Sequence, residues 1–288
     1  MRILITGGRG MLARALVREL SERSHEVTAP GRSELDASDT TALDQFVRRY
    51  RPTALIQCAA YTRVDDAEAD EAGAFATNAV AAARAAEVCR KAGVRFIYPS
   101  TDYVFDGTAT QPYAPWQTPA PRSAYGRSKL AGEWAARLAG DFIVVRTAWL
   151  YGSGGRSFVS AILEQARRGG SLRVVADQWG SPTWTMDLAA VIAKLLERSA
   201  PAGVYHATNR GKTTWHGFAT EIARRIGFPG EVVAIDSAQA NRHAIRPSYS
   251  VLDVRETEGL VGAIPDWEDA IGRALPSDFS AGVPNAIQ

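Results

Sequence analysis

The sequence has few cysteines and none of the long apolar runs that mark secreted or membrane proteins. Its two cysteines, Cys58 and Cys89, cannot form a disulfide framework, and both lie in apolar segments, as in a reducing cytosol. The apolar stretch at residues 3–5 is far too short for a signal peptide or a membrane span, and no other run approaches that length. We therefore expect a soluble, cytoplasmic protein with no membrane partner.

An excess of charge of one sign is also missing. The chain has 33 basic and 31 acidic residues, a formal net charge of +2, and the basic residues are scattered rather than clustered. No field of one sign favours a nucleic acid, so a small metabolite fits better as the partner. The four histidines do not have the spacing of metal ligands, and we predict no metal site.

The first half of the chain alternates short apolar runs with longer alanine-rich segments of helical period. The predicted strands are residues 2–6, 26–29, 54–58, 95–99 and 142–146, and the predicted helices are residues 10–23, 41–50, 72–91 and 123–139. Apolar strands separated by helices indicate a parallel sheet covered on both faces. The predicted fold class is therefore α/β, a Rossmann-type doubly wound parallel sheet.

The alternation becomes irregular after about Tyr151, where Gly, Pro and Trp become frequent. We expect a dinucleotide-binding domain over residues 1–150, with return segments to it near residues 185–208. A smaller C-terminal α/β substrate-binding lobe is expected over residues 151–276. Residues 277–288 are predicted to be a disordered tail.

The run TGGRGMLA at residues 6–13 follows the first predicted strand and opens the first helix. Gly7 permits a tight turn, and Gly10 lets the backbone approach a pyrophosphate, to which the helix N-terminus offers amides and a positive dipole. An ordinary strand-to-helix turn is the alternative. Because the run begins a βαβ array, we assign Gly7, Gly10, Met11 and Leu12 to a dinucleotide cofactor.

The end of the second predicted strand bears on the choice of cofactor. An acidic residue there would bind the adenosine ribose, but residues 30–33 read PGRS. Arg32 and Ser33 could instead receive a 2′-phosphate, so we favour NADPH, with NADH possible; a solvated arginine on a turn is the alternative. Asp36 could contact the adenine or equally cap a helix.

The runs STDY at residues 100–103 and YGRSK at 125–129 suggest an acid for carbonyl reduction. Residues four apart share a helix face, so the Lys129 ammonium should lie beneath the Tyr125 phenol and reach the nicotinamide ribose. Attraction of roughly 4 kcal/mol, for about 4 Å and a dielectric of about 20, would move the tyrosine pKa from about 10 toward neutrality. Thr101, at the carboxyl end of a strand, would hold the carbonyl oxygen. Alternatively, Tyr125 is a partly buried aromatic residue and Lys129 a surface charge.

Longer strings show a resemblance to a known family. They are CAAYTRVD at residues 58–65, STDYVFDG at 100–107, YGRSKLAGE at 125–133, RTAWLY at 146–151, DQWGSPT at 177–183 and RP at 246–247. Over nearly its whole length the chain resembles the dTDP-4-dehydrorhamnose reductase family of the extended short-chain dehydrogenase/reductases. The resemblance implies reduction of a 4-keto group on a dTDP-linked 6-deoxysugar, with hydride from NADPH or NADH, Tyr125 as proton donor, and Lys129 and Thr101 beside it.

Further site residues follow from the same resemblance. It implies that the cofactor is lined by Ala59, Ala60 and Thr62, and that the sugar nucleotide is lined by Thr101, Asp102, Tyr103 and Trp149. Arg246 is a separate candidate, because Pro247 places it near a turn and its planar fork suits a pyrophosphate. A homodimer is possible, and some relatives hold a metal at an interface.

Two departures from the family pattern leave the substrate open. Ser157 stands where the family usually has Asn, and Ala148 where Ser is usual. A secondary-metabolite 4-ketoreductase acting on another dTDP-deoxysugar is therefore an alternative. A non-catalytic nucleotide-binding regulatory subunit is another, since one relative regulates a methionine adenosyltransferase by binding it. Retention of Thr101, Tyr125 and Lys129 argues against this second alternative.

Overall fold

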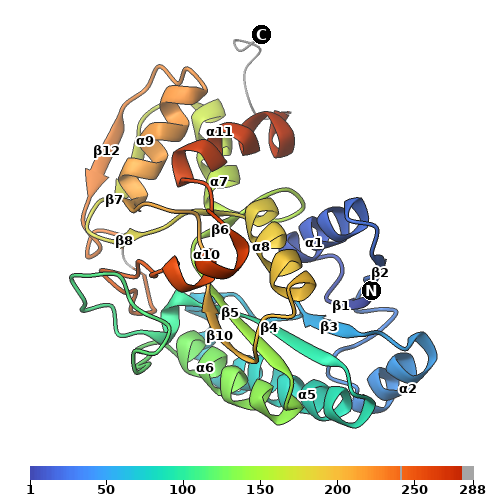
Figure 1. Ribbon diagram of the computed structural model, residues 1–288. Coiled ribbons are helices and arrows are strands. Elements are labelled where there is room, and N and C mark those ends of the chain that lie inside the picture. Colours follow the sequence, from blue (N-terminus) through green and yellow to red (C-terminus); the bar gives the residue numbers. More distant parts are fainter. Residues whose placement is uncertain (241, 281–288) are drawn as a thin grey trace.

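The computed structural model describes residues 1–240 and 242–280 and contains a six-stranded parallel sheet (Figure 1). The strand order is β10-β5-β4-β3-β1-β2. The strands are β1 (Arg2–Thr6), β2 (Glu26–Thr28), β3 (Ala54–Gln57), β4 (Arg95–Thr101), β5 (Phe142–Thr147) and β10 (Gly203–His206). The order reverses direction at β1, so the predicted doubly wound α/β fold is confirmed.

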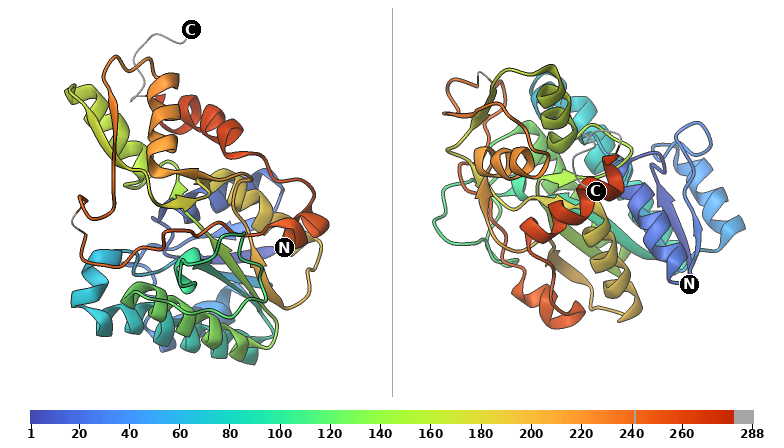
Figure 2. Two further views of the ribbon diagram at one scale, coloured as in Figure 1. Left: turned by 90° about the vertical axis from the view of Figure 1, so that its left-hand side faces the viewer. Right: turned by 90° about the horizontal axis from the view of Figure 1, so that it is seen from above.

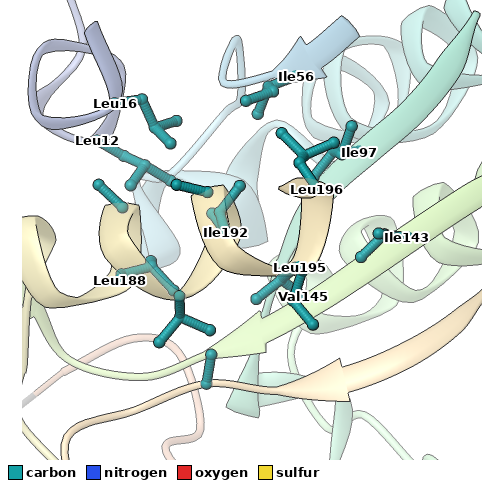
Figure 3. Close-up of a cluster of buried hydrophobic side chains, with 14 of the residues drawn as sticks. Leu12, Leu16, Ile56, Ile97, Ile143, Val145, Leu188, Ile192, Leu195 and Leu196 are labelled. Carbon is teal, nitrogen blue, oxygen red and sulfur yellow. The ribbon is translucent and has the colours of Figure 1, made fainter. Parts of the chain in front are cut away.

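Helices cover both faces of this sheet because successive residues of each strand point to opposite sides. On one face, α1 (Met11–Glu22) and α8 (Thr185–Glu197) pack over Ile3 and Ile5 of β1. On the other face, α2 (Thr40–Tyr50), α5 (Ala81–Ala92) and α6 (Ala124–Ala136) pack over Leu4 and its neighbours. Figure 3 shows the first of these layers, with Leu12 and Leu16 of α1 beside Leu188 and Ile192 of α8. None of the helices in the described chain has the length and apolarity needed to cross a membrane.

The helix predicted over residues 72–91 is interrupted in the structure. It consists of α4 (Glu71–Phe75), a π-helical turn η1 (Ala76–Val80) and α5. The backbone carbonyl of Asn78, inside η1, accepts a hydrogen bond from the Tyr98 hydroxyl of β4 at 2.8 Å. The Asn78 side chain binds both the amide and the carbonyl of Tyr61. These tertiary contacts stabilise the π-helical turn, which the alanine-rich sequence does not indicate.

Apart from α8 and β10, which join the layers of the main sheet, much of the second half of the chain builds a smaller lobe on one side of the sheet (Figure 2). Its core is formed by α7 (Phe158–Arg168), α9 (Trp215–Arg225), α11 (Trp267–Asp278) and the parallel pair of β7 (Leu172–Val175) and β12 (Val232–Ile235). Shorter elements complete the chain: α3 (Val64–Ala69), η2 (Asp102–Val104), η3 (Arg137–Ala139), β6 (Leu150–Tyr151), β8 (Trp179–Gly180), β9 (Thr183–Trp184), β11 (Thr213–Thr214) and α10 (Arg255–Val261).

The disordered tail predicted over residues 277–288 begins too early. Ser277 and Asp278 belong to α11, so the prediction is wrong for them. The Asp278 carboxylate accepts hydrogen bonds from the Trp184 indole at 2.9 Å and from the Ser153 amide at 3.0 Å. These contacts order the end of a helix whose polar residues look solvated in the sequence. Residues 281–288 lie outside the described residues.

Helix α6 crosses η1 and β4 at a point that leaves no room for a side chain. A β-carbon at Gly132 would lie 2.1 Å from the Tyr98 hydroxyl oxygen and 2.2 Å from the Asn78 carbonyl oxygen. We expect Gly132→Ala to lower the free energy of unfolding by about 1–3 kcal/mol, because the helix must move away from the sheet. Urea unfolding followed by circular dichroism measures the change.

Gly259→Ala is the matched control, since Gly259 lies in α10 and a β-carbon there would meet nothing within 4 Å. It should stabilise the protein slightly, by up to about 1 kcal/mol, because alanine favours a helix. Equal stabilities for the two variants would contradict the packing argument.

Candidate active site

The loop between β1 and α1 accepts only glycine at two positions. Gly7 has φ +68°, and a β-carbon on it would lie 2.7 Å from the Ala59 nitrogen. A β-carbon on Gly8 would lie 1.9 Å from the carbonyl oxygen of Ala29. Gly10 occupies the N-cap of α1, where no side chain caps the first amides and no acidic residue lies in the first turn. This shape fits the phosphate groups of a dinucleotide.

Three of the predicted cofactor residues differ in how they can contribute. Leu12 packs into the core between α1 and α8, so only its backbone can face a ligand at the helix end. Met11 is partly exposed and lies near Gly155, in the loop after β6. Ala59 lies behind Gly7, where its amide hydrogen-bonds the Thr6 hydroxyl at 3.5 Å.

The turn after β2 holds more charge than the sequence suggested. Arg32 has a side chain that is 88% exposed and an Nε 3.4 Å from Asp36. Glu34 brings a carboxylate into this turn, where it accepts the Gly31 amide at 2.7 Å. Arg9, from the glycine loop, reaches the same turn, because a β-carbon on Gly31 would lie 2.9 Å from its Nε. Sequence reasoning missed Arg9, since only the fold brings the two loops together.

Asp36 is not the N-cap of α2. That position belongs to Asp39, whose side chain accepts the Ala42 amide at 3.0 Å. Asp36 instead accepts hydrogen bonds from the amide and hydroxyl of Ser38, which lower the pKa of its carboxyl. The capping alternative is therefore wrong, and Asp36 stays at the turn beside Arg32.

Thr101, Tyr125 and Lys129 meet at the carboxyl end of β4. Thr101 is the last residue of that strand, and α6 begins beside it with Ser123 as N-cap, whose hydroxyl accepts the Gly126 amide at 3.1 Å. The Thr101 hydroxyl hydrogen-bonds Tyr125. The Lys129 ammonium donates to the Pro99 carbonyl at 2.7 Å and lies 3.9 Å from the centre of the Tyr98 ring. The fold thus joins the three residues predicted to handle the proton.

The predicted fall in the Tyr125 pKa is wrong in this structure. Burial raises the pKa of Tyr125 to about 12, against the hydrogen bond with Thr101. Burial also lowers the pKa of Lys129 to about 7, against the attraction of Glu133. The ammonium turns toward Pro99 and Tyr98, and desolvation is the largest effect on the pKa of both Tyr125 and Lys129. Tyr125 therefore keeps its proton at neutral pH, which is the state that a proton donor requires.

Asp102 and Tyr103 line the other side of this group. Asp102 is buried and its carboxylate accepts a hydrogen bond from the Thr101 hydroxyl at 3.0 Å. Burial raises the pKa of Asp102 to about 6. The Tyr103 ring packs edge-to-face on Tyr125, with 5.6 Å between ring centres. Tyr103 also hydrogen-bonds Arg246, which links the group to the second lobe.

A cavity of about 810 Å³ lies between the carboxyl edge of the sheet and the second lobe. Thr62, just after β3, lines it on the side of the sheet; Ala60 lies two residues earlier and is partly buried. Trp215 lines it on the side of the lobe and stacks on Trp149, with 3.5 Å between ring centres and 7° between planes. Trp149 has φ +48°, so the backbone adopts a rare conformation to place this indole.

Arginines dominate the charge of the cavity wall, but Arg246 is already paired. Its two terminal nitrogens lie 3.0 and 2.8 Å from the Asp65 carboxylate oxygens, and that contact lowers the pKa of Asp65. Arg156, Arg173 and Arg242 also line the cavity. Among the described residues none of the three forms a direct ion pair, although the charge of Arg242 also helps to lower the pKa of Asp65. Sequence reasoning missed these three, because they come from separate segments, and only the glycine run before Arg156 gave a local signal.

The two departures from the family pattern occupy different places. Ala148 is buried and directly precedes Trp149 in the chain. Ser157 lines the cavity and is the N-cap of α7, where its hydroxyl accepts the Ser160 amide at 3.3 Å.

The sequence model of one family, described as the RmlD substrate binding domain, matches residues 1–278. The chain belongs to this family. It is 45% identical to a probable dTDP-4,6-dihydroxy-2-methyloxan-3-one 4-ketoreductase of Streptomyces antibioticus, over 99% of this chain and 98% of that one. It is 43% identical to the dTDP-4-keto-6-deoxy-D-glucose reductase of Streptomyces niveus, over 96% of each chain.

Solved structures of the family have the same fold. The crystal structure of Bacillus anthracis dTDP-4-dehydrorhamnose reductase in complex with NADP matches with a TM-score of 0.92 and 34% identity, covering 96% of this chain and 98% of that one. The family predicted from the sequence strings is therefore confirmed.

Arg9 and Arg32 generate a prediction about the cofactor. Replacing either with alanine should weaken NADPH binding about tenfold, because a charge-assisted contact to the 2′-phosphate is lost, while NADH binding changes little. Titration of cofactor fluorescence gives both dissociation constants. Arg48→Ala, which removes an exposed arginine of α2, is the control and should alter neither. Equal weakening of NADPH and NADH would show that the two arginines do not recognise the phosphate.

Proposed function

We propose that this protein reduces the 4-keto group of a dTDP-4-keto-6-deoxysugar with NADPH, or with NADH, and that dTDP-4-dehydro-L-rhamnose is the favoured substrate, giving dTDP-L-rhamnose. The observation that carries the proposal is the meeting of Thr101, Tyr125 and Lys129 at the carboxyl edge of the sheet. Tyr103, which packs on Tyr125, links this group to Arg246 in the wall of an arginine-lined cavity. The named relatives at 45% and 43% identity are both ketoreductases of this chemical class.

The cofactor would be held by the glycine loop and would supply hydride. Gly7 and Gly10 leave room for its pyrophosphate, and the uncapped amides of α1 would bind the phosphate oxygens. Arg9 and Arg32 stand where the adenosine end would lie, and a 2′-phosphate there suits their charge.

The chain's own residues would handle the proton. Tyr125, which keeps its proton at neutral pH, would give it to the carbonyl oxygen as that oxygen gains negative charge. The Lys129 ammonium, buried beside it, would stabilise the resulting phenolate. Thr101 would orient the same oxygen by donating its hydroxyl hydrogen, which it gives to the Asp102 carboxylate in this structure, to the carbonyl oxygen instead.

The cavity would take the nucleotide end of the substrate. A diphosphate carries negative charge, and Arg156, Arg173 and Arg242 offer three guanidinium groups. The stacked pair of Trp149 and Trp215 offers a flat apolar surface to a sugar or a base. Both terminal nitrogens of Arg246 hydrogen-bond the Asp65 carboxylate. We therefore assign Arg246 to stabilising the cavity wall and not to binding the pyrophosphate by itself.

A second sugar substrate has specific support. Ala148 is buried and precedes Trp149 in the chain, Ser157 lines the cavity, and both residues depart from the family pattern. We therefore keep another dTDP-deoxysugar of secondary metabolism as the alternative substrate within the same reaction.

The decisive experiment measures turnover and the acid together. Purified protein should oxidise NADPH when given dTDP-4-dehydro-L-rhamnose, and a panel of dTDP-4-keto sugars ranks the substrates by kcat/KM. Tyr125→Phe should lower kcat by about 10²–10⁴-fold, because the proton donor is lost, with cofactor binding unchanged. Full rate in Tyr125→Phe would show that another group is the acid. Cofactor binding with no turnover on any sugar, together with a stable complex with a partner enzyme, would favour the regulatory subunit instead.

We also propose a homodimer. Trp134 of α6 and Leu138 of η3 lie one turn apart, and they are 62% and 55% exposed. Val80, in the neighbouring η1, is also exposed. Exposed apolar side chains gathered in this way mark a protein interface. Sedimentation should give twice the chain mass, and Trp134→Glu should give the monomer mass; a wild-type monomer at high concentration would contradict the proposal.

The reducing cytoplasm remains our proposed location. Cys58 and Cys89 are both free thiols, and burial raises the pKa of each to about 12, which keeps them unreactive. Fractionation of the producing cells tests the location.

A further inference from the structure

Helix α6 carries a third ionisable residue in register with the two that act on the substrate. Tyr125, Lys129 and Glu133 follow one another at intervals of four, so they share one face of the helix. Glu133 has a side chain that is only 3% exposed, and it follows Lys129 by four residues along α6. The reaction described above does not use it.

Glu133 belongs to a buried ion pair that ties α6 to the sheet. The Arg146 guanidinium of β5 donates to both of its carboxylate oxygens, through Nε at 2.9 Å and Nη2 at 2.7 Å. The Ser100 hydroxyl of β4 donates to the same carboxylate at 2.5 Å. Ser100 precedes Thr101, so the carboxylate also holds the end of the strand that carries the reacting hydroxyl.

Arg146 has further partners that fix it in place. It donates to the Pro115 carbonyl at 3.2 Å and lies 5.0 Å from the centre of the Phe105 ring. His206 of β10 faces it, with 3.5 Å between His206 Nε2 and Arg146 Nη1. Burial and the nearby guanidinium lower the pKa of His206 to about 3, so it stays neutral and does not compete for Glu133.

The groups around Lys129 come from three elements. On α6 they are Tyr125 and Glu133; on β4 they are the Tyr98 ring and the Pro99 carbonyl; after β3 there is Cys58. The phenols of Tyr98 and Tyr125 and the Cys58 thiol all have raised pKa values and are neutral at pH 7. Among these described neighbours of Lys129, only Glu133 is negatively charged.

A buried ion pair is a poor source of stability, since well-packed apolar residues often do as well. Its position is better explained by what its negative end does to Lys129. We propose that Glu133 is a positioning residue that keeps Lys129 in its ammonium form and, through Ser100, holds the end of β4 against it. The kinetic part of this inference rests on the proposed function, while the charge on Lys129 can be measured without turnover.

The direction of the effect follows from the charges. Burial favours the neutral amine of Lys129, whereas Glu133 favours its ammonium form. Removing the Glu133 carboxylate should therefore lower the pKa of Lys129 from its value of about 7. A fall of about one pKa unit would reduce the charged fraction at neutral pH several-fold.

The chain suits a direct measurement, because it has only four lysines: Lys91, Lys129, Lys194 and Lys212. Protein labelled with ¹³C at the lysine ε-carbon should give four NMR signals, and Lys129→Met assigns the relevant one. Glu133→Gln should lower the Lys129 midpoint by about one unit and leave the other three unchanged, and Glu133→Asp, which keeps the charge, should restore it toward the wild-type value. An unchanged midpoint in folded Glu133→Gln would overturn the proposal.

Two further variants separate charge from damage to the fold. Glu133→Gln leaves Arg146 buried without its partner, so the double variant Glu133→Gln, Arg146→Gln removes both charges and should still lower the Lys129 midpoint. Asp187→Asn breaks the ion pair with Arg273 elsewhere in the molecule and is the control. If Asp187→Asn lowers the Lys129 midpoint equally, general loosening explains the result and the proposal fails.

The kinetic readout distinguishes this proposal from the function on which it rests. If Lys129 acts as a cation, the alkaline limb of kcat/KM should move to lower pH in Glu133→Gln by the same amount as the NMR midpoint. A limb that stays in place while the midpoint moves would overturn the role of Glu133 in the reaction. A wild-type protein without turnover on any sugar would overturn the proposed function, and the NMR midpoints would still decide the charge of Lys129.

Discussion

Close packing of α6 on β4 is the constraint on which the site depends. Gly132 brings the helix so near to the Asn78 carbonyl and the Tyr98 hydroxyl that a β-carbon has no space. The hydrogen bond between Tyr98 and Asn78 fixes the same contact from the side of the sheet, where the neighbouring helix opens into η1. Because the Lys129 ammonium lies over the Tyr98 ring, the distance between α6 and the sheet also determines where that ammonium lies.

Burial then decides the protonation states. A desolvated group resists charge of either sign, so the pKa of Tyr125 rises to about 12 and that of Asp102 to about 6, while that of Lys129 falls to about 7. Glu133 opposes this trend only at Lys129, because it shares that residue's helix face. At neutral pH the site therefore combines a protonated phenol with a lysine near its midpoint, whose charge depends on its surroundings.

The second lobe adds local charge that the whole chain does not have. The formal net charge is only +2, yet Arg156, Arg173 and Arg242 converge on one cavity. The Asp65 carboxylate neutralises the Arg246 guanidinium, and this ion pair forms part of the cavity wall. Within the part of the chain that the structure describes, the charge of the other three arginines is not neutralised by a direct ion pair of this kind. A nearly neutral protein can thus contain a strongly basic cavity, which suits the nucleotide diphosphate that we propose as its ligand.

The sequence by itself determined the features that depend on neighbours along the chain. The period of the apolar residues specified the doubly wound sheet, the freedom of Gly7 specified the turn before α1, and the four-residue spacing placed Tyr125 and Lys129 on one face. The tertiary structure alone decided the π-turn at Asn78, the arrival of Arg9 at the Gly31 turn, and the order of the chain at Asp278. It also reversed the expected direction of the Tyr125 pKa, because desolvation is caused by residues of several elements that are far apart in the sequence.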